Sequence, residues 1–347
     1  MRVPVREDSG LKGEGPPIAS GGPSPLDFAE PFRPAPGLGH PQAQTLLAYA
    51  FRRPGPLPLR RERVDTPDHD FLDLDWLAAP ADRPHLLVLH GLEGSSASGY
   101  VRQTLHEARA LGWGAVAMNF RSCSGEPNRL VRSYCSGETA DPLFVAGHVR
   151  ARIRAPLVAV GFSLGGNALL KLLAETGADA PFAAAAAVST PYDLQACADA
   201  LDEPWGRCGV YRRHFLRSLR GKALLKLERH PGHGLDVERV RRAPDLRAFD
   251  DAFTALTYGF ADAREYYARC SSGPMLGRIR RPTLLLNAED DPMVPGASLP
   301  RIAEHDRWLT VLRTRRGGHV GFVQGGLLSP RYWSERQAVR FLAARIG

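Results

Sequence analysis

The stretch that decides the fold is Val158-Ala159-Val160-Gly161-Phe162-Ser163-Leu164-Gly165-Gly166-Asn167. Its apolar first half predicts a buried strand, and the pattern from Leu164 to Glu175 predicts a helix directly after it. A Gly-x-Ser-x-Gly turn between a strand and a helix is the context of a nucleophile elbow. Gly161 and Gly165 suit so sharp a turn, because a Cβ at either position would collide with neighbouring backbone. We therefore expect Ser163 to stand at the start of the helix with its hydroxyl clear of the sheet.

Two residues far along the chain complete a possible catalytic triad. A serine hydroxyl becomes nucleophilic near neutral pH only with a base beside it and an acid that orients the base. After an elbow of this kind, the acid and then a histidine follow the serine in the chain. Asp291 follows Ser163 by 128 residues, and His319 follows Asp291 by 28. Both come just after predicted strands, so we expect Ser163, Asp291 and His319 to meet at one edge of the sheet.

Neighbouring residues in the same loops have assignments of their own. Asp290 competes with Asp291 for the role of the acid, and the Asp-x-x-Val-Pro pattern favours Asp291. The oxyanion hole would take the backbone N–H groups of Leu92 and Leu164. His90 is expected to hold the glycine-rich loop that follows it by hydrogen bonds, rather than to act on substrate.

Apolar runs and helical patterns alternate through the rest of the chain. Buried strands are expected at 86–89, 115–118, 157–161, 182–189, 283–286 and 309–313. Helices are expected near 40–47 and at 99–111, 138–152, 164–175 and 330–346. Two more strands are expected at 59–66 and 70–78, the second as a half-exposed edge strand. This alternation predicts an α/β fold with a mostly parallel central sheet and helices on both faces.

The domain organisation follows from changes in composition. Residues 1–37 are rich in Gly, Pro and Ser, which predicts a mobile N-terminal tail. Residues 38–347 then form one domain. Between about 192 and 273 the pattern indicates three or four helices and no buried strand, so we expect an inserted helical cap over the active site.

Composition excludes several classes of protein. The net charge of +8 comes almost entirely from arginine, and no nucleic-acid-binding motif is present, so no nucleic-acid partner is expected. The five cysteines are widely spaced without a C-x-x-C, and the histidines lack ligand spacing, so neither a disulfide framework nor a metal site is expected. The chain shows no signal peptide and no apolar run long enough to span a bilayer. These features predict a cytoplasmic protein, with peripheral membrane contact left open.

Five motifs in order resemble those of the YheT-like α/β-hydrolases over roughly residues 38–346. They are His90-Gly91-Leu92-Glu93-Gly94-Ser95, Asn119-Phe120-Arg121-x-Cys123-Ser124-Gly125-Glu126-Pro127-Asn128, Ser136-Gly137-Glu138-Thr139, Gly161-Phe162-Ser163-Leu164-Gly165-Gly166-Asn167 and Gly317-Gly318-His319-x-Gly321-Phe322. The resemblance implies an α/β-hydrolase fold and a carboxylic ester hydrolase that needs no cofactor. It carries the triad onto Ser163, Asp291 and His319. Relatives in this family are described as short-chain carboxylesterases, acylglycerol lipases or phospholipases.

The chain departs from the family pattern at three places outside the triad. Gln42-Ala43-Gln44-Thr45 stands where the family usually has His-x-Gln-Thr, Ser122 replaces a usual glycine, and Cys135 replaces a usual histidine. The leading interpretation is a serine esterase that acts on small carboxylic esters. One alternative is a lipid-directed acylglycerol lipase, phospholipase or acyltransferase with the same triad. A more remote alternative is a non-catalytic α/β-hydrolase used as a binding module.

Overall fold

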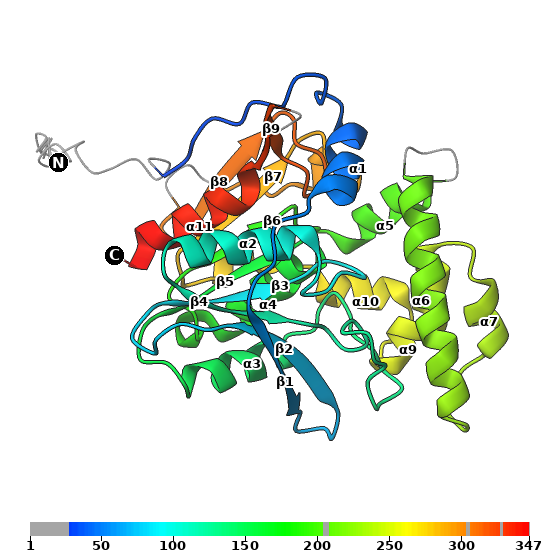
Figure 1. Cartoon of the computed structure of the whole chain (residues 1–347). Helices are drawn as coiled ribbons and strands as arrows, with labels where there is room; N and C mark the ends of the chain where they lie inside the picture. Colours follow the sequence, from blue (N-terminus) through cyan, green and yellow to red (C-terminus); the bar gives the residue numbers. More distant parts are fainter. Residues whose placement is uncertain (1–27, 204–207, 303–305, 327–328, 347) are drawn as a thin grey trace, which may run out of the picture.

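A computed structural model describes residues 28–203, 208–302, 306–326 and 329–346. Within these residues, eight strands form one sheet in the order β1-β2-β4-β3-β5-β6-β7-β8 (Figure 1). The strands are β1 (Leu59–Asp65), β2 (Phe71–Leu77), β3 (His85–Leu89), β4 (Gly114–Met118), β5 (Leu157–Phe162), β6 (Ala185–Val188), β7 (Thr283–Ala288) and β8 (Leu309–Thr314). β2 runs antiparallel to β1 and β4, and the strands from β4 to β8 are parallel. The predicted mostly parallel sheet is confirmed.

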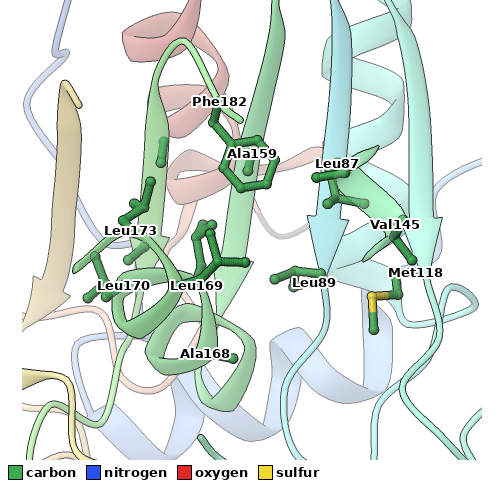
Figure 2. Close-up of a cluster of buried hydrophobic side chains, with 14 of the residues drawn as sticks. Leu87, Leu89, Met118, Val145, Ala159, Ala168, Leu169, Leu170, Leu173 and Phe182 are labelled. Atoms are coloured by element: carbon green, nitrogen blue, oxygen red, sulfur yellow. The ribbon is translucent and has the colours of Figure 1, made fainter. Parts of the chain in front are cut away.

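Helices cover both faces of the sheet because successive side chains of a strand point to opposite sides. The covering helices are α2 (Gly99–Ala110), α3 (Ala140–Arg150), α4 (Leu164–Thr176) and α11 (Trp333–Ile346). In β3, Leu86 and Val88 pack with the side chains of α2 and α11, whereas Leu87 and Leu89 pack with those of α3 and α4. Figure 2 shows the second of these clusters, with Leu89 of β3 beside Leu169 of α4. Burying each such leucine contributes roughly 1.5–3 kcal/mol.

The second strand differs from the prediction of a half-exposed edge strand. β2 lies between β1 and β4, and every one of its residues is buried. Its alternating polar residues do not face solvent, because Asp73 and Asp75 form ion pairs with Arg63 and Arg61 of β1, at 2.8 and 2.7 Å. β1 is the edge strand at this end of the sheet. The sequence alone does not show that the arginines of β1 pair with the aspartates of β2, so the burial of β2 was not predicted.

The described residues between β6 and β7 form helices joined by turns and contain no strand, and we call residues 192–273 the helical insertion. Its elements are α5 (Leu194–Asp202), α6 (Gly209–Arg229), α7 (Val237–Arg242), α8 (Leu246–Phe249), a π-helical turn (Asp250–Thr254), α9 (Ala255–Thr257) and α10 (Ala263–Cys270). They exceed the three or four helices expected, since several are short. Figure 1 shows them gathered on one side of the molecule.

The predicted tail ends too late in the chain. Residues 1–27 lie outside the described residues, but residues 28–37 pack on the domain. The rings of Phe28 and Phe32 lie 5.2 and 5.3 Å from those of Phe341 and Trp333 in α11. The indole N–H of Trp333 donates to the backbone oxygen of Glu30 at 2.9 Å. Two isolated aromatic residues in a stretch rich in proline and glycine are too few to establish a helical or strand pattern, which is why composition alone misassigned them.

Short elements complete the described structure. They are α1 (Pro41–Phe51), the hairpin strands β9 (Val323–Gly326) and β10 (Ser329–Tyr332), and the 3-10 turns Gly177–Asp179, Gly273–Arg278 and Gly296–Ser298. The hairpin was not expected from the sequence, and the closing helix therefore begins at Trp333 rather than near Pro330.

Candidate active site

The turn between β5 and α4 contains Ser163 alone. Its backbone has φ 51° and ψ −121°, a conformation that L-residues rarely adopt. The two glycines around it are required by close approach. A Cβ on Gly161 would lie 2.4 Å from the oxygen of Gly165, and a Cβ on Gly165 would lie 2.5 Å from the oxygen of His90. The sharp turn lifts the Ser163 side chain to the end of the sheet.

The structure brings the three predicted side chains together in one hydrogen-bonded chain. Ser163 Oγ lies 3.0 Å from Nε2 of His319, and Nδ1 of the same ring lies 2.8 Å from Oδ2 of Asp291. The Asp291 side chain is fully buried, and its Oδ1 accepts from the backbone N–H groups of Met293 and Val294 at 2.8 and 3.1 Å. The carboxylate therefore has a fixed orientation, with one oxygen held by its own loop and the other facing the imidazole.

Asp290 has a different place in the same loop. Its Oδ1 accepts from the N–H of Gly318 at 2.9 Å, immediately before His319. Burial raises the pKa of Asp290, a shift opposed by that N–H and reinforced by the neighbouring Asp291. Asp290 thus contacts the backbone of the histidine loop, while Asp291 contacts the ring.

The loop that contains His319 is held by hydrogen bonds to three residues that the sequence analysis did not assign to the site. The N–H of His319 donates to Thr45 Oγ1 of α1 at 2.9 Å, and the N–H of Val320 donates to Ser189 at 3.0 Å. Arg52 follows α1 and donates to the oxygens of Val320 and Gly321, both at 2.7 Å. Thr45 belongs to the Gln42–Thr45 motif quoted above, which was the one signal available in the sequence. Arg52 and Ser189 carried none.

The predicted oxyanion loop is fastened by His90. Its Nε2 accepts from the N–H of Phe120 at 3.1 Å, so its Nδ1 carries the proton and donates to the oxygen of Gly91 at 2.7 Å. Complete burial lowers the pKa of His90 to about 4, which keeps the ring neutral. Leu92 and Leu164 both border the same cavity as Ser163. Leu164 is the first residue of α4, so its N–H has no partner within the helix.

Glu93, next to Leu92, connects this loop to the helical insertion. The Tyr134 hydroxyl accepts from the Glu93 N–H and donates to its carboxylate, each at 2.8 Å. Lys222 of α6 forms an ion pair with the same carboxylate at 2.9 Å. The Glu93 side chain is only 3% exposed, whereas that of Lys222 is 30% exposed, so water reaches the pair only from the lysine side. A single carboxylate therefore joins the insertion to the loop that carries Leu92.

A cavity of about 120 Å³ lies beside Ser163 and His319. Its walls are largely apolar and come mostly from the helical insertion; they include Leu201, Phe215, Leu219, Leu246 and Met293. A substrate group placed there is removed from water next to the serine hydroxyl. Such a concave, mostly apolar site with few polar groups is typical of small-ligand pockets.

Two further searches bear on the expectations from the sequence. Among the described residues, no group of three or more His, Cys, Asp or Glu side chains is arranged to hold a metal ion. In the same part of the chain, no helix has both the length and the apolar character needed to cross a membrane. All five cysteines lie within the described residues, where none forms a disulfide and all are buried.

Comparison with known proteins establishes the family. The family model described as the alpha/beta hydrolase fold matches residues 84–326. This chain belongs to the α/β-hydrolase family. It is 41% identical to Escherichia coli YheT, which is named as a candidate esterase, over 88% of this chain and 90% of that protein. The resemblance to YheT-like hydrolases is therefore confirmed.

More distant relatives have lipid-related names. The mouse phospholipase ABHD3 is 31% identical over 85% of this chain and 74% of its own length. The monoacylglycerol lipase of Saccharomyces cerevisiae is 30% identical over 82% of this chain and 63% of its own. Among solved structures, the Pyrococcus furiosus esterase Pf2001 superposes with a TM-score of 0.52 at 16% identity, over 84% of this chain and 94% of that one. At that identity the structural likeness supports the fold alone.

Proposed function

We propose that this α/β-hydrolase is a serine esterase that cleaves small carboxylic esters with Ser163, His319 and Asp291. The observation that carries the proposal is the continuous hydrogen-bond chain from Ser163 through the imidazole to the buried carboxylate, at 3.0 and 2.8 Å. Esterase and lipase names among the relatives support ester chemistry in this family.

Acylation begins with attack of Ser163 Oγ on the ester carbonyl carbon. His319 Nε2 takes the hydroxyl proton, and Asp291 stabilises the imidazolium through its hydrogen bond to Nδ1. The N–H groups of Leu92 and Leu164 would hold the negative oxygen of the tetrahedral intermediate, the largest single source of stabilisation in acyl transfer. The C–O bond then breaks, and the imidazolium returns its proton to the leaving alcohol.

Deacylation repeats these steps with water in place of the serine. His319 removes a proton from a water molecule, which attacks the acyl carbon, and Ser163 leaves with a proton from the ring. The products are the carboxylic acid and free enzyme. Protein groups and water suffice for this route, so the proposal includes no cofactor and no metal.

The size of the cavity favours short acyl or alcohol groups over long lipid chains. An engineered protein cavity of roughly 150 Å³ binds benzene, which has six heavy atoms. The cavity beside Ser163 is slightly smaller, at about 120 Å³. A lipid-directed enzyme with the same triad is the second candidate, and it draws its support from the phospholipase and monoacylglycerol lipase names.

A fluorophosphonate probe and a panel of p-nitrophenyl esters from acetate to palmitate test the proposal. The wild type is expected to be labelled at Ser163 and to hydrolyse acetate and butyrate faster than palmitate. Ser163→Ala is expected to lose both labelling and turnover, because no other serine occupies the elbow. Labelling that persists in the variant would refute the assignment, and a preference for palmitate or monoacylglycerols would favour the lipid-directed alternative.

A further inference from the structure

Asp250 is the one carboxylate among the described residues that border the largely apolar cavity, and it takes no part in the proposed chemistry. Asp250 begins the π-helical turn of the insertion and borders the same cavity as Ser163 and His319. Asp250 is only partly exposed, and many protein atoms surround its carboxylate. Thr254, at the other end of the turn, also borders the cavity. π-helical turns of this kind often occur at functional sites.

The bonding of Asp250 leaves it without a compensating cation. Its Oδ2 accepts from the Tyr267 hydroxyl of α10 at 2.7 Å, and the Thr254 side chain adds a second hydrogen bond. The charged groups that act on it are Asp202 and Asp251, both acidic, and no lysine or arginine among the described residues pairs with it. Burial raises the pKa of Asp250 to about 6, a shift that these two hydrogen bonds oppose. Near neutral pH the group is therefore mainly an ionised acceptor.

An anion of this kind needs a reason to be kept in an apolar pocket. Burial of a charge is costly unless it is paired or hydrogen-bonded. The hydrogen bonds from Tyr267 and Thr254 offset part of this cost, while no ion pair among the described residues does. In a mostly apolar pocket, a small number of placed polar groups orients a ligand and sets specificity. A carboxylate accepts hydrogen bonds and donates none, so the complementary group on a substrate is a hydroxyl or another donor.

We propose that Asp250 and Tyr267 form a hydroxyl-binding subsite, so that the preferred ester carries a free hydroxyl on its acyl or its alcohol part. The inference rests on the proposed esterase function and narrows its substrate class to short hydroxylated esters. The cavity of about 120 Å³ has room for a chain of a few carbons ending in such a hydroxyl. Asp250 here is a specificity-determining residue that binds substrate away from the reacting carbonyl.

Two pairs of esters test the subsite, each differing by the replacement of a hydroxyl with a methyl group. 2-Hydroxyethyl butyrate against propyl butyrate places the hydroxyl on the alcohol, and methyl 6-hydroxyhexanoate against methyl heptanoate places it on the acyl chain. In the wild type, kcat/KM is expected to be higher by about tenfold or more for the hydroxylated member of one pair. A factor of this size is what a hydrogen bond to a charged group typically contributes. The pair that shows the preference identifies which part of the ester occupies the cavity.

Variants separate specificity from general damage. In the pair that shows the preference, Asp250→Leu is expected to bring the ratio of kcat/KM for the hydroxylated ester to that for the methyl-terminated ester to about one. The methyl-terminated ester should still be hydrolysed. Asp250→Asn, which keeps the shape and one acceptor oxygen, is expected to give an intermediate ratio. The matched control is Asp251→Asn, since Asp251 accepts from the N–H of Ala263 and does not border the cavity. It should keep the wild-type ratio.

A binding measurement makes the subsite testable apart from turnover. In the Ser163→Ala protein, 2-butoxyethanol is expected to raise Tm more than butyl propyl ether, and addition of Asp250→Leu should abolish that difference. Equal hydrolysis within both ester pairs by an active wild type would overturn the subsite and leave the esterase proposal standing. Hydroxyl-dependent binding by a protein that hydrolyses no ester would overturn the esterase proposal and support the subsite. A ratio that persists in Asp250→Leu would also overturn the subsite.

Discussion

At the scale of single residues, the site depends on which of two adjacent carboxylates faces the imidazole. Asp291 lies 2.8 Å from His319 Nδ1, whereas Asp290 accepts from a backbone N–H of the histidine loop. The two therefore contact the same histidine loop in different ways: Asp291 faces the ring nitrogen, and Asp290 binds the backbone N–H before it.

We predict that Asp291→Asn lowers kcat by roughly 10³–10⁴-fold with the fold intact, because a neutral amide neither stabilises the imidazolium nor selects the productive tautomer. Asp290→Asn should cost about tenfold or less, since the amide oxygen can still accept from Gly318 and only a small displacement is expected. Both values come from steady-state kinetics on one activated ester, with circular dichroism as the folding control. If Asp290→Asn were the crippled variant, the acid would have to be reassigned.

Residue-level chemistry was predictable where it depended on local pattern. Gly161, Ser163 and Gly165 are close in sequence, and the glycines around His319 mark its loop, so these features could be found without a structure. Arg52 and Asp250 could not, because their roles arise from contacts between segments far apart in the chain. An arginine after a helix or an aspartate within a helix is most often a solvent-exposed surface residue. No spacing rule distinguishes such a surface residue from one that contacts a functional loop or a cavity.

At the scale of elements, helix α6 borders the cavity and contacts the loop that carries Leu92, the predicted oxyanion residue. Leu219 borders the cavity, and Lys222, three residues later on the same helix, pairs with Glu93. One face of α6 is thus directed at the active site, while Leu225 on the same helix is 37% exposed. At least one of the many basic residues of this chain, Lys222, therefore has a specific partner.

We predict that Leu219→Ala shifts the ester preference toward longer acyl chains. Removing this side chain enlarges the cavity, and each additional methylene that a pocket accommodates changes discrimination by roughly tenfold or more. The ratio of kcat/KM for p-nitrophenyl hexanoate to that for acetate should therefore rise by about tenfold. Leu225→Ala is the control on the same helix and should leave the ratio unchanged. Equal ratios in both variants would show that α6 does not limit the acyl group.

The predictions of individual elements were wrong in two situations. One is a strand whose polar residues are buried in ion pairs, and the other is a stretch in which single aromatic residues pack on the domain. The alternation in β2 matched an exposed edge, yet its aspartates are neutralised by arginines of β1. Phe28 and Phe32 lie in a stretch of tail-like composition, yet both pack on α11. The buried strands of the central sheet were predicted well, because continuous apolar runs leave few alternatives in an α/β protein.

At the scale of the whole molecule, a buried histidine that contributes to stability also holds the loop that carries Leu92, the predicted oxyanion residue. His90 is completely buried between the end of β3 and the loop after β4, with a neutral ring that accepts from one segment and donates to the other. This hydrogen bonding requires the neutral tautomer. Acid should therefore destabilise the protein through a residue that lies next to the active site without taking part in the proposed reaction.

The last prediction concerns the pH dependence of the free energy of unfolding. Desolvation lowers the pKa of His90 from 6.5 to about 4, an effect opposed by the Gly91 oxygen, reinforced by Lys222 and weakened by Glu93. Between these values the unfolded chain binds a proton that the folded protein does not, so stability is fully present above pH 6.5 and is lost as the pH falls toward 4. One such group accounts for a loss of about 3 kcal/mol over this window.

Urea unfolding of the wild type at several pH values from 7 to 4.5 tests this prediction. The free energy of unfolding should fall by this contribution from His90 in addition to the contribution from carboxylates that become protonated. His90→Asn is expected to be less stable at pH 7 but to lose less stability on acidification, because the carboxylates are common to both proteins. Parallel curves for the two proteins would mean that His90 does not carry the acid sensitivity.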